Sequence, residues 1–267
     1  MKTEINKTVI LFSIFSVILI LYLLITIGNL IISQLVIDAG ALWKTMWDSS
    51  VLKSIWISFS ASFVSTAIAF LFGTPLAYFL ARKNFPGKNF IESLIDVPVI
   101  IPHTVAGIAL ISVFGYNGLI GSPLEEIGIR FVDAFPGIVV AMLFVSIPFY
   151  INHVREGFES IDPKLENVAR TLGESEWGTF RTITLPLAYR DVLAGSIMSW
   201  ARGISEFGAV ILITYYPMIA PVLIFERFRS FGLGASRPIA VVLILVSILI
   251  FVILRYLSRG WSLYAKD

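Results

Sequence analysis

The chain has 267 residues, of which 57% are hydrophobic and 14% are charged. Soluble globular domains carry nearer ~25% charged residues, so this composition predicts an integral membrane protein. The net charge of +2 gives no electrostatic footprint for nucleic acid, and the absence of cysteine excludes disulfides, thiolate metal sites and cysteine nucleophiles. The length suits a single membrane domain over 1–267, with no room for a separate soluble catalytic domain.

The first apolar run covers 9–32 and follows Lys2 and Lys7. The apolar core of a secretory signal is only ~7–15 residues long, and no small-residue cleavage pattern follows this run. We therefore expect a retained first transmembrane span.

Six stretches are long enough to cross ~30 Å of hydrocarbon as helices. They lie at 9–32, 54–81, 97–115, 136–153, 190–213 and 238–257. Pro98 and Pro102 predict an irregular start to the third, because proline interrupts helical hydrogen bonding. The predicted fold class is thus an all-α integral membrane protein with six transmembrane helices.

Lysine and arginine fall unevenly on the two sides of these spans. Roughly thirteen lie at the termini and in the connections at 82–96 and 155–190, against roughly six in the other connections. Positive charge is retained on the cytoplasmic side of membranes. We therefore expect a multi-pass protein of the cytoplasmic membrane, with both termini and the 155–190 connection inside the cell.

The connection at about 156–187 is unusually polar for its place between apolar spans. Asp162 can cap a helix that starts with Pro163, and Ser175 can cap a second helix. Gly173 suits the left-handed residue that ends a helix. Helical spacing puts four apolar residues on one face, namely Leu165, Val168, Ala169 and Leu172. The sequence predicts two short helices, which either dock on a partner or lie on lipid headgroups.

The spacing here resembles the cytoplasmic signature of ABC-importer permeases, which reads E-A-A, three residues, G, nine residues, I-x-L-P. Aligned on Gly173, the I-x-L-P element falls on Ile183, Leu185 and Pro186. Asn167 replaces the usual glutamate, and Val168 replaces the first alanine. Glu166 carries an acid one position earlier, as is common in the oxyanion branch.

In that family the segment is the coupling helix, which rests in a cleft on a separate ATPase subunit. The resemblance implies that the contacts with the ATPase are made by Glu166, Asn167, Ala169, Arg170, Gly173 and Glu174. It also implies that ATP and Mg²⁺ are used by two copies of that ATPase, with no cofactor on this chain. A second permease copy, forming a homodimer, and an external oxyanion-binding protein complete the implied assembly.

Two further segments resemble molybdate, tungstate and sulfate permeases. They are DVPVIIPHTVAGIALISVFG at 96–115 and SWARGISEFGAVILI at 199–213, while FERFRSFGLGASRPIAVVLIL at 225–245 resembles archaeal tungstate/molybdate systems. Together with the connection at about 156–187, these resemblances cover most of residues 50–260. It implies molybdate or tungstate import by alternating access, with sulfate or another oxyanion as the alternative.

A dianion that crosses hydrocarbon loses its hydration, so its path should offer hydroxyls, N–H groups or a positive charge. The candidates for the path or a gate are Pro102, His103, Thr104, Ser199, Arg202, Ser205 and Glu206. Arg202 and Glu206 share a helix face, which fits a structural ion pair as well as a place on the path. His103 could instead cap a helix or bond a neighbouring span. For the serines of 54–81 we favour close helix packing.

Other function classes have less support. The sequence contains no H-E-x-x-H, G-x-S-x-G or Walker motif, so we expect no catalytic residues and no ATP hydrolysis by this chain. We also expect no metal site, because the only two histidines lie in different predicted spans. An ATP-independent channel or carrier, and a purely structural subunit, remain as alternatives.

Overall fold

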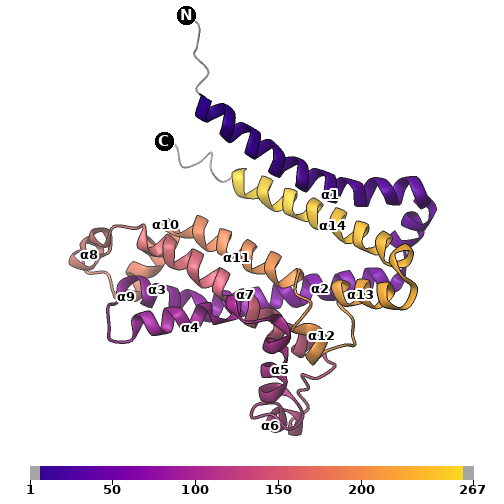
Figure 1. The fold of residues 1–267 in the computed structure, drawn as a ribbon. Helices are drawn as coiled ribbons and strands as arrows, with labels where there is room; N and C mark the ends of the chain where they lie inside the picture. Colours follow the sequence, from indigo (N-terminus) through magenta and orange to yellow (C-terminus); the bar gives the residue numbers. More distant parts are fainter. Residues whose placement is uncertain (1–6, 261–267) are drawn as a thin grey trace, which may run out of the picture. The chain divides into compact units, whose positions relative to one another are not determined.

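The computed structural model describes residues 7–260, and the side chains of 8–254. Every regular element in this range is a helix, which confirms the all-α class. The chain divides into two compact units, drawn in Figure 1. One comprises the described parts of Met1–Lys53 and Leu223–Asp267, and the other is Ser54–Val222. The organisation of 1–267 as a single domain remains a prediction.

The first unit is built on two long apolar helices, α1 (Lys7–Met46) and α14 (Leu233–Gly260), which run beside each other (Figure 1). The backbone of α1 kinks at Asp38, whose carboxylate accepts a hydrogen bond from the amide of Ala41 at 2.7 Å. Asp48 accepts the amides of Ser50 and Val51 at the start of α2 (Ser49–Ile68). The Ser50 hydroxyl also bonds this carboxylate and lowers the pKa of Asp48.

The second unit is organised around α7 (Phe135–Glu159), which packs against α3 (Thr74–Arg82), α4 (Lys88–Ile100) and α11 (Tyr189–Ile204) (Figure 1). Buried side chains form two clusters along it, one around Met142 and the other around Tyr150 and Phe158. The Tyr150 hydroxyl is 2.6 Å from the Thr74 hydroxyl, so the one buried polar group is satisfied by the other.

The serines of α2 serve helix packing in this unit. The Ser62 hydroxyl donates to the carbonyl of Trp200 in α11 at 2.6 Å, and the Ser58 hydroxyl accepts the amide of Ala220 at 2.8 Å. A Cβ at Gly203 would lie 2.3 Å from the Ser62 hydroxyl, so α2 and α11 approach closely here. These contacts agree with the packing role favoured from the sequence.

Two π-helical turns interrupt the helices, at η1 (Ala69–Gly73) and η2 (Phe180–Thr184). The first joins α2 to α3, so the apolar stretch Ser49–Arg82 continues through it as one candidate span. The second follows α9 (Glu176–Thr179) and leads through α10 (Leu185–Leu187) into α11. Turns of this kind are rare and occur frequently at functional sites.

The number of spans differs from the prediction. In the described residues, four helices are long and apolar enough to cross a membrane, or five with the bent pair α4 and α5 (His103–Phe114). That pair bends by 112° at Ile101–Pro102, which confirms the irregular start of the third span. The predicted fifth span, 190–213, is broken between α11 and α12 (Val210–Ile213), because 205–209 are not helical. Six membrane crossings remain a prediction.

Candidate coupling and translocation sites

The polar connection folds as two short helices joined by a tight turn, as predicted. Asp162 caps α8 (Pro163–Thr171) by accepting the amide of Lys164 at 2.9 Å. Gly173 ends it with a φ of +97°, a conformation that side chains rarely adopt. Ser175 then caps α9 by accepting the amide of Gly178 at 2.9 Å. We call this segment, 163–179, the knuckle.

The outer surface of the knuckle is apolar. Leu165 and Val168 on α8 are exposed, and so are Leu172, directly after α8, and Trp177 on α9, which stacks against Phe180. Ala169 was expected on the same face, but it is buried together with Glu166. Positions three residues apart lie on one side of a helix, so 166 and 169 share the inner side and 165, 168 and 172 the outer one. The knuckle thus presents large apolar side chains that stay exposed in the described part of the chain.

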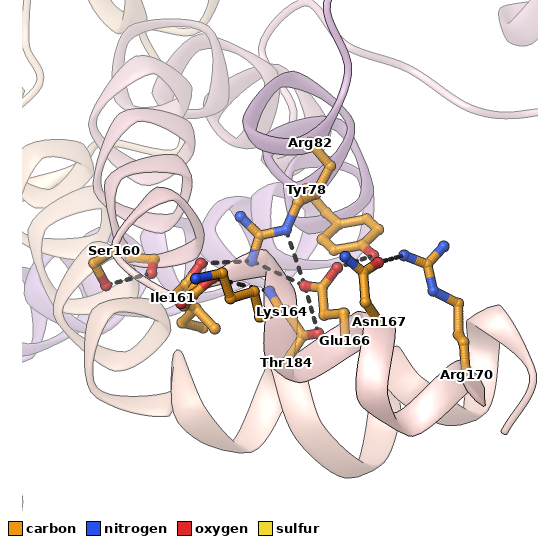
Figure 2. Close-up of polar contacts among 11 residues, drawn as sticks. Tyr78, Arg82, Ser160, Ile161, Lys164, Glu166, Asn167, Arg170 and Thr184 are labelled. Atoms are coloured by element: carbon orange, nitrogen blue, oxygen red, sulfur yellow. Dashed lines mark hydrogen bonds and ion pairs between the residues drawn. The ribbon is translucent and has the colours of Figure 1, made fainter. Parts of the chain in front are cut away.

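Glu166 is the most deeply placed of the predicted contact residues. Its carboxylate accepts a hydrogen bond from Arg82 Nε at 2.9 Å, and the same oxygen forms an ion pair with Arg82 Nη2 at 2.8 Å (Figure 2). The Thr184 hydroxyl donates to the same oxygen at 2.9 Å, and the Tyr78 hydroxyl donates to the other oxygen at 3.4 Å. With the Glu166 side chain only 5% exposed, this charge is directed into the protein.

The other predicted contact residues, apart from Ala169, lie on the surface. Asn167, Arg170, Gly173 and Glu174 are all exposed. Arg170 donates to the side-chain oxygen of Asn167 at 2.5 Å, and its guanidinium is 3.9 Å from Glu176 (Figure 2 shows the first pair). Exposed pairs such as these contribute about 0–1 kcal/mol and remain free to exchange partners.

A cleft of about 650 Å³ opens between the knuckle and the end of α3. Its walls are aromatic and basic, and they include Tyr78, Phe79, Arg82, Lys83, Arg170 and Trp177. The ion pair between Arg82 and Glu166 borders the cleft. The knuckle therefore meets α3 beside an open space, through the polar contacts of Glu166 and through Phe180, whose ring packs against Tyr78 and stacks on Trp177.

A second polar cluster forms where two helices are interrupted. Glu206, with 2% of its side chain exposed, lies just beyond the end of α11, and His103 begins α5 after the Ile101–Pro102 bend. Arg202 Nη2 is 3.1 Å from Glu206 Oε2 and 3.0 Å from His103 Nε2. His103 Nδ1 is 3.3 Å from the same carboxylate oxygen. The other Glu206 oxygen accepts the amide of Ala209 at 2.8 Å, at the start of α12.

The remaining predicted path residues differ in their placement. Pro102, Thr104 and Ser205 are exposed, and the Ser205 hydroxyl bonds back to the carbonyl of Arg202 at 2.9 Å. Ser199 is fully buried, and its hydroxyl has no hydrogen-bond partner in the described part of the chain. The structure thus brings His103, Arg202, Ser205 and Glu206 together, while the Ser199 hydroxyl makes no hydrogen bond to any of them.

Sequence reasoning missed Tyr78, Arg82 and Thr184 as members of a site. Arg82 was counted only as one of the positive charges on the cytoplasmic side. Thr184 occupies the unspecified x position of the I-x-L-P element. The signal that could have found them is the displaced acid at 166, because a carboxylate on the inner face of a short helix needs a buried cation.

Comparison with known proteins places the chain in a family. Residues 73–263 match the model of the binding-protein-dependent transport system inner membrane component. The molybdate/tungstate transport system permease protein WtpB of Thermococcus kodakarensis is 46% identical over 252 residues, with 94% of this chain and 96% of the relative covered. WtpB of Pyrococcus furiosus is 49% identical, with 84% and 85% covered. The sulfate transport system permease protein CysT of Escherichia coli is 32% identical, with 86% and 84% covered.

Solved structures show the same fold. A bacterial ABC transporter involved in the import of the acidic polysaccharide alginate contains a chain that superimposes with a TM-score of 0.73, over 99% of this chain and 98% of that chain. The sequences are only 15% identical, so this likeness concerns the fold alone. The family model covers well over half of the residues, and the chain therefore belongs to the inner membrane components of binding-protein-dependent transport systems, which are transport subunits rather than enzymes.

Proposed function

We propose that this chain is the permease subunit of an ATP-driven importer of molybdate or tungstate. The observation that carries this proposal is the identity of 46% and 49% with two proteins named molybdate/tungstate permeases, against 32% with a sulfate permease. The higher identity to the molybdate/tungstate permeases agrees with the resemblance of residues 225–245 to archaeal tungstate/molybdate systems. Sulfate or another oxyanion is the second candidate, supported by the CysT relative, which also covers most of the chain.

The proposed assembly contains two copies of this chain, two ATPase subunits that use ATP and Mg²⁺, and an external binding protein that delivers the anion. One alginate transporter structure of this fold, with a TM-score of 0.71, is described as a complex with a ligand-bound periplasmic protein. That likeness supports a matching partner here only by analogy of fold. The excess of basic residues at the termini and in the 155–190 connection supports a cytoplasmic location for both termini and for the knuckle.

The knuckle is proposed to dock on the ATPase through its outer surface. An exposed tryptophan among exposed leucines suits a protein socket, because tryptophan is among the residues that supply most of the binding energy when they are buried at interfaces. Asn167, Arg170, Gly173 and Glu174 would form the polar rim of that contact. Glu166 and Ala169 are assigned to the inner face instead, since both are buried within this chain.

The cluster of His103, Arg202 and Glu206 is proposed to lie on the anion path, with Pro102, Thr104, Ser199 and Ser205 as neighbours along it. Interrupted helices inside a membrane are tolerated where they line a cavity or are buried in protein, and they mark binding sites in many transporters. The Glu206 carboxylate 3.1 Å from Arg202 offsets much of the guanidinium charge. A path with such a pair attracts an anion without holding it too tightly to leave.

Transport would follow from alternating access. Closure of the nucleotide-bound ATPases would move the two knuckles together and open the path outward, and nucleotide release would restore the inward-open form. In this scheme the ATPases move the knuckle, and this movement changes the access of the anion to the cluster around Arg202. A channel or an ion-coupled carrier would need neither the knuckle nor a motor.

Uptake by reconstituted protein tests this proposal. We expect proteoliposomes that contain this chain with its ATPase and binding protein to accumulate radiolabelled tungstate only with ATP. Accumulation should vanish when the ATPase carries an inactivating substitution in its Walker motif. Unlabelled molybdate should compete at much lower concentration than sulfate. Uptake without ATP would contradict the importer, and stronger competition by sulfate would reassign the anion.

A further inference from the structure

The knuckle is fastened to the membrane helices by one buried ion pair. Arg82, the last residue of α3, and Glu166, in the first turn of α8, meet at 2.8 Å, with side chains 10% and 5% exposed. The two residues are far apart in sequence. Through this contact the end of the candidate span Ser49–Arg82 is joined directly to the segment proposed to touch the ATPase.

The pair gathers four segments at one point. Arg82 Nη2 also donates to the carbonyl of Ile161, in the linker that joins α7 to α8, at 3.3 Å. Glu166 accepts the Thr184 hydroxyl from the π-helical turn η2, and the Tyr78 hydroxyl from α3 (Figure 2). Movement of α8 would thus act on α3, on the end of α7 and on the entry to α11 together.

Stability alone does not account for such a pair. Taking two charges out of water costs several kcal/mol per ion, and apolar pairs of similar volume are often as stable. What the ion pair provides is direction, because the guanidinium donates one hydrogen bond from Nε to the carboxylate and another from Nη2 to the Ile161 carbonyl, and the two together fix its position and orientation. Beside it lies the cleft of about 650 Å³, and α3 also reaches the knuckle through Phe180, whose ring lies 5.0 Å from that of Tyr78 and stacks on Trp177.

We propose that the Arg82–Glu166 pair is the link that carries movement of the knuckle to α3 during transport. This rests on the proposed function, and it assigns a task to residues that touch neither the ATPase nor the anion. Glu166 is then a positioning residue on the inner side of the knuckle. Without the link, displacement of α8 reaches the spans along the chain, through α7 and α11, and through the ring contact of Phe180 with Tyr78.

The test is the double substitution Arg82→Gln/Glu166→Gln, which removes both charges and leaves no unpaired ion buried. We expect the complex to assemble, to melt within a few degrees of the wild type and to hydrolyse ATP. The number of tungstate ions imported per ATP should fall at least about fivefold, the lower end of common coupling energies. Unchanged import per ATP in an assembled complex would overturn the proposal.

A matched control comes from another ion pair in the same unit. Arg155 in α7 and Glu92 in α4 lie 2.8 Å apart and are also largely shielded, but neither belongs to the knuckle. The substitution Arg155→Gln/Glu92→Gln should leave import per ATP unchanged. An equal loss in this control would assign the effect to general loosening of the helices and overturn the proposal.

A second variant decides the matter if the double substitution prevents assembly. Thr184→Val keeps the ion pair and removes one hydrogen bond from the same carboxylate oxygen. It should lower import per ATP without releasing the ATPase, and a wild-type ratio would count against the link. Failure of the proposed function would look different, because the wild-type chain would then neither retain the ATPase on purification nor require ATP for uptake.

Discussion

Replacement of Arg202 by alanine is expected to abolish tungstate uptake and to destabilise the protein. The change leaves the Glu206 carboxylate, with 2% of its side chain exposed, with His103 and the Ala209 amide as its partners among the described residues. Removal of one partner from a buried ion pair costs about 3–5 kcal/mol, because the remaining charge is no longer compensated. Uptake into proteoliposomes and the thermal unfolding of purified protein measure the two effects.

The double substitution Arg202→Ala/Glu206→Ala separates folding from transport. We expect it to recover most of the thermal stability but not the uptake, since the positive charge on the proposed path is still missing. Recovery of uptake would make the pair purely structural and would contradict its place on the path. Arg130→Ala is the matched control, because this arginine forms an exposed ion pair with Glu125, worth about 0–1 kcal/mol, and its loss should change neither measurement.

Replacement of Gly173 by valine is expected to uncouple transport from ATP hydrolysis. The glycine has a φ of +97°, and a Cβ there would meet nothing within 4 Å, so the backbone and not the available space opposes a side chain. A branched side chain in this conformation costs about 1–2 kcal/mol, enough to displace the turn between α8 and α9. We expect uptake per ATP to fall roughly tenfold and less ATPase to copurify.

Asparagine at the same position is the informative control. It tolerates positive φ better than other side chains do. Gly173→Asn should therefore keep most of the coupled uptake, although it too adds a side chain at this position. If valine supports uptake as well as glycine does, the geometry of the turn does not matter for coupling. If both variants fail equally, the surface at 173 must be in contact with a partner that tolerates no side chain.

The knuckle was predictable because its determinants are local. Asp162 and Ser175 cap helices through their own neighbours along the chain, and Gly173 occupies a conformation that few other residues accept. These preferences depend on spacing within about one helical turn, and so they can be read from a single sequence. The pairing of Arg202 with Glu206 follows from the same logic, since the residues lie four apart.

The contacts that join distant segments could not be predicted in the same way. Nothing near Glu166 in the sequence indicates that its partner is Arg82, and the approach of His103 to Arg202 depends on how two helix breaks meet. The break at 205–209 was missed because the apolar residues on both sides of it were joined into one span, although Ser205 and Glu206 interrupt them and the helix stops there. Tertiary packing, and not local propensity, decides these features.

Photo-cross-linking from the knuckle tests the central claim most directly. The chain has no cysteine, so a single Leu172→Cys substitution gives one unique attachment point on the exposed apolar surface. With a photoreactive maleimide at this position, the account predicts a cross-link to the ATPase in membranes during ATP turnover. The same label on a Tyr116→Cys variant, at an exposed position beyond the end of α5, should give no such product. Cross-links from position 172 to lipid alone, in a preparation that imports tungstate, would contradict the account.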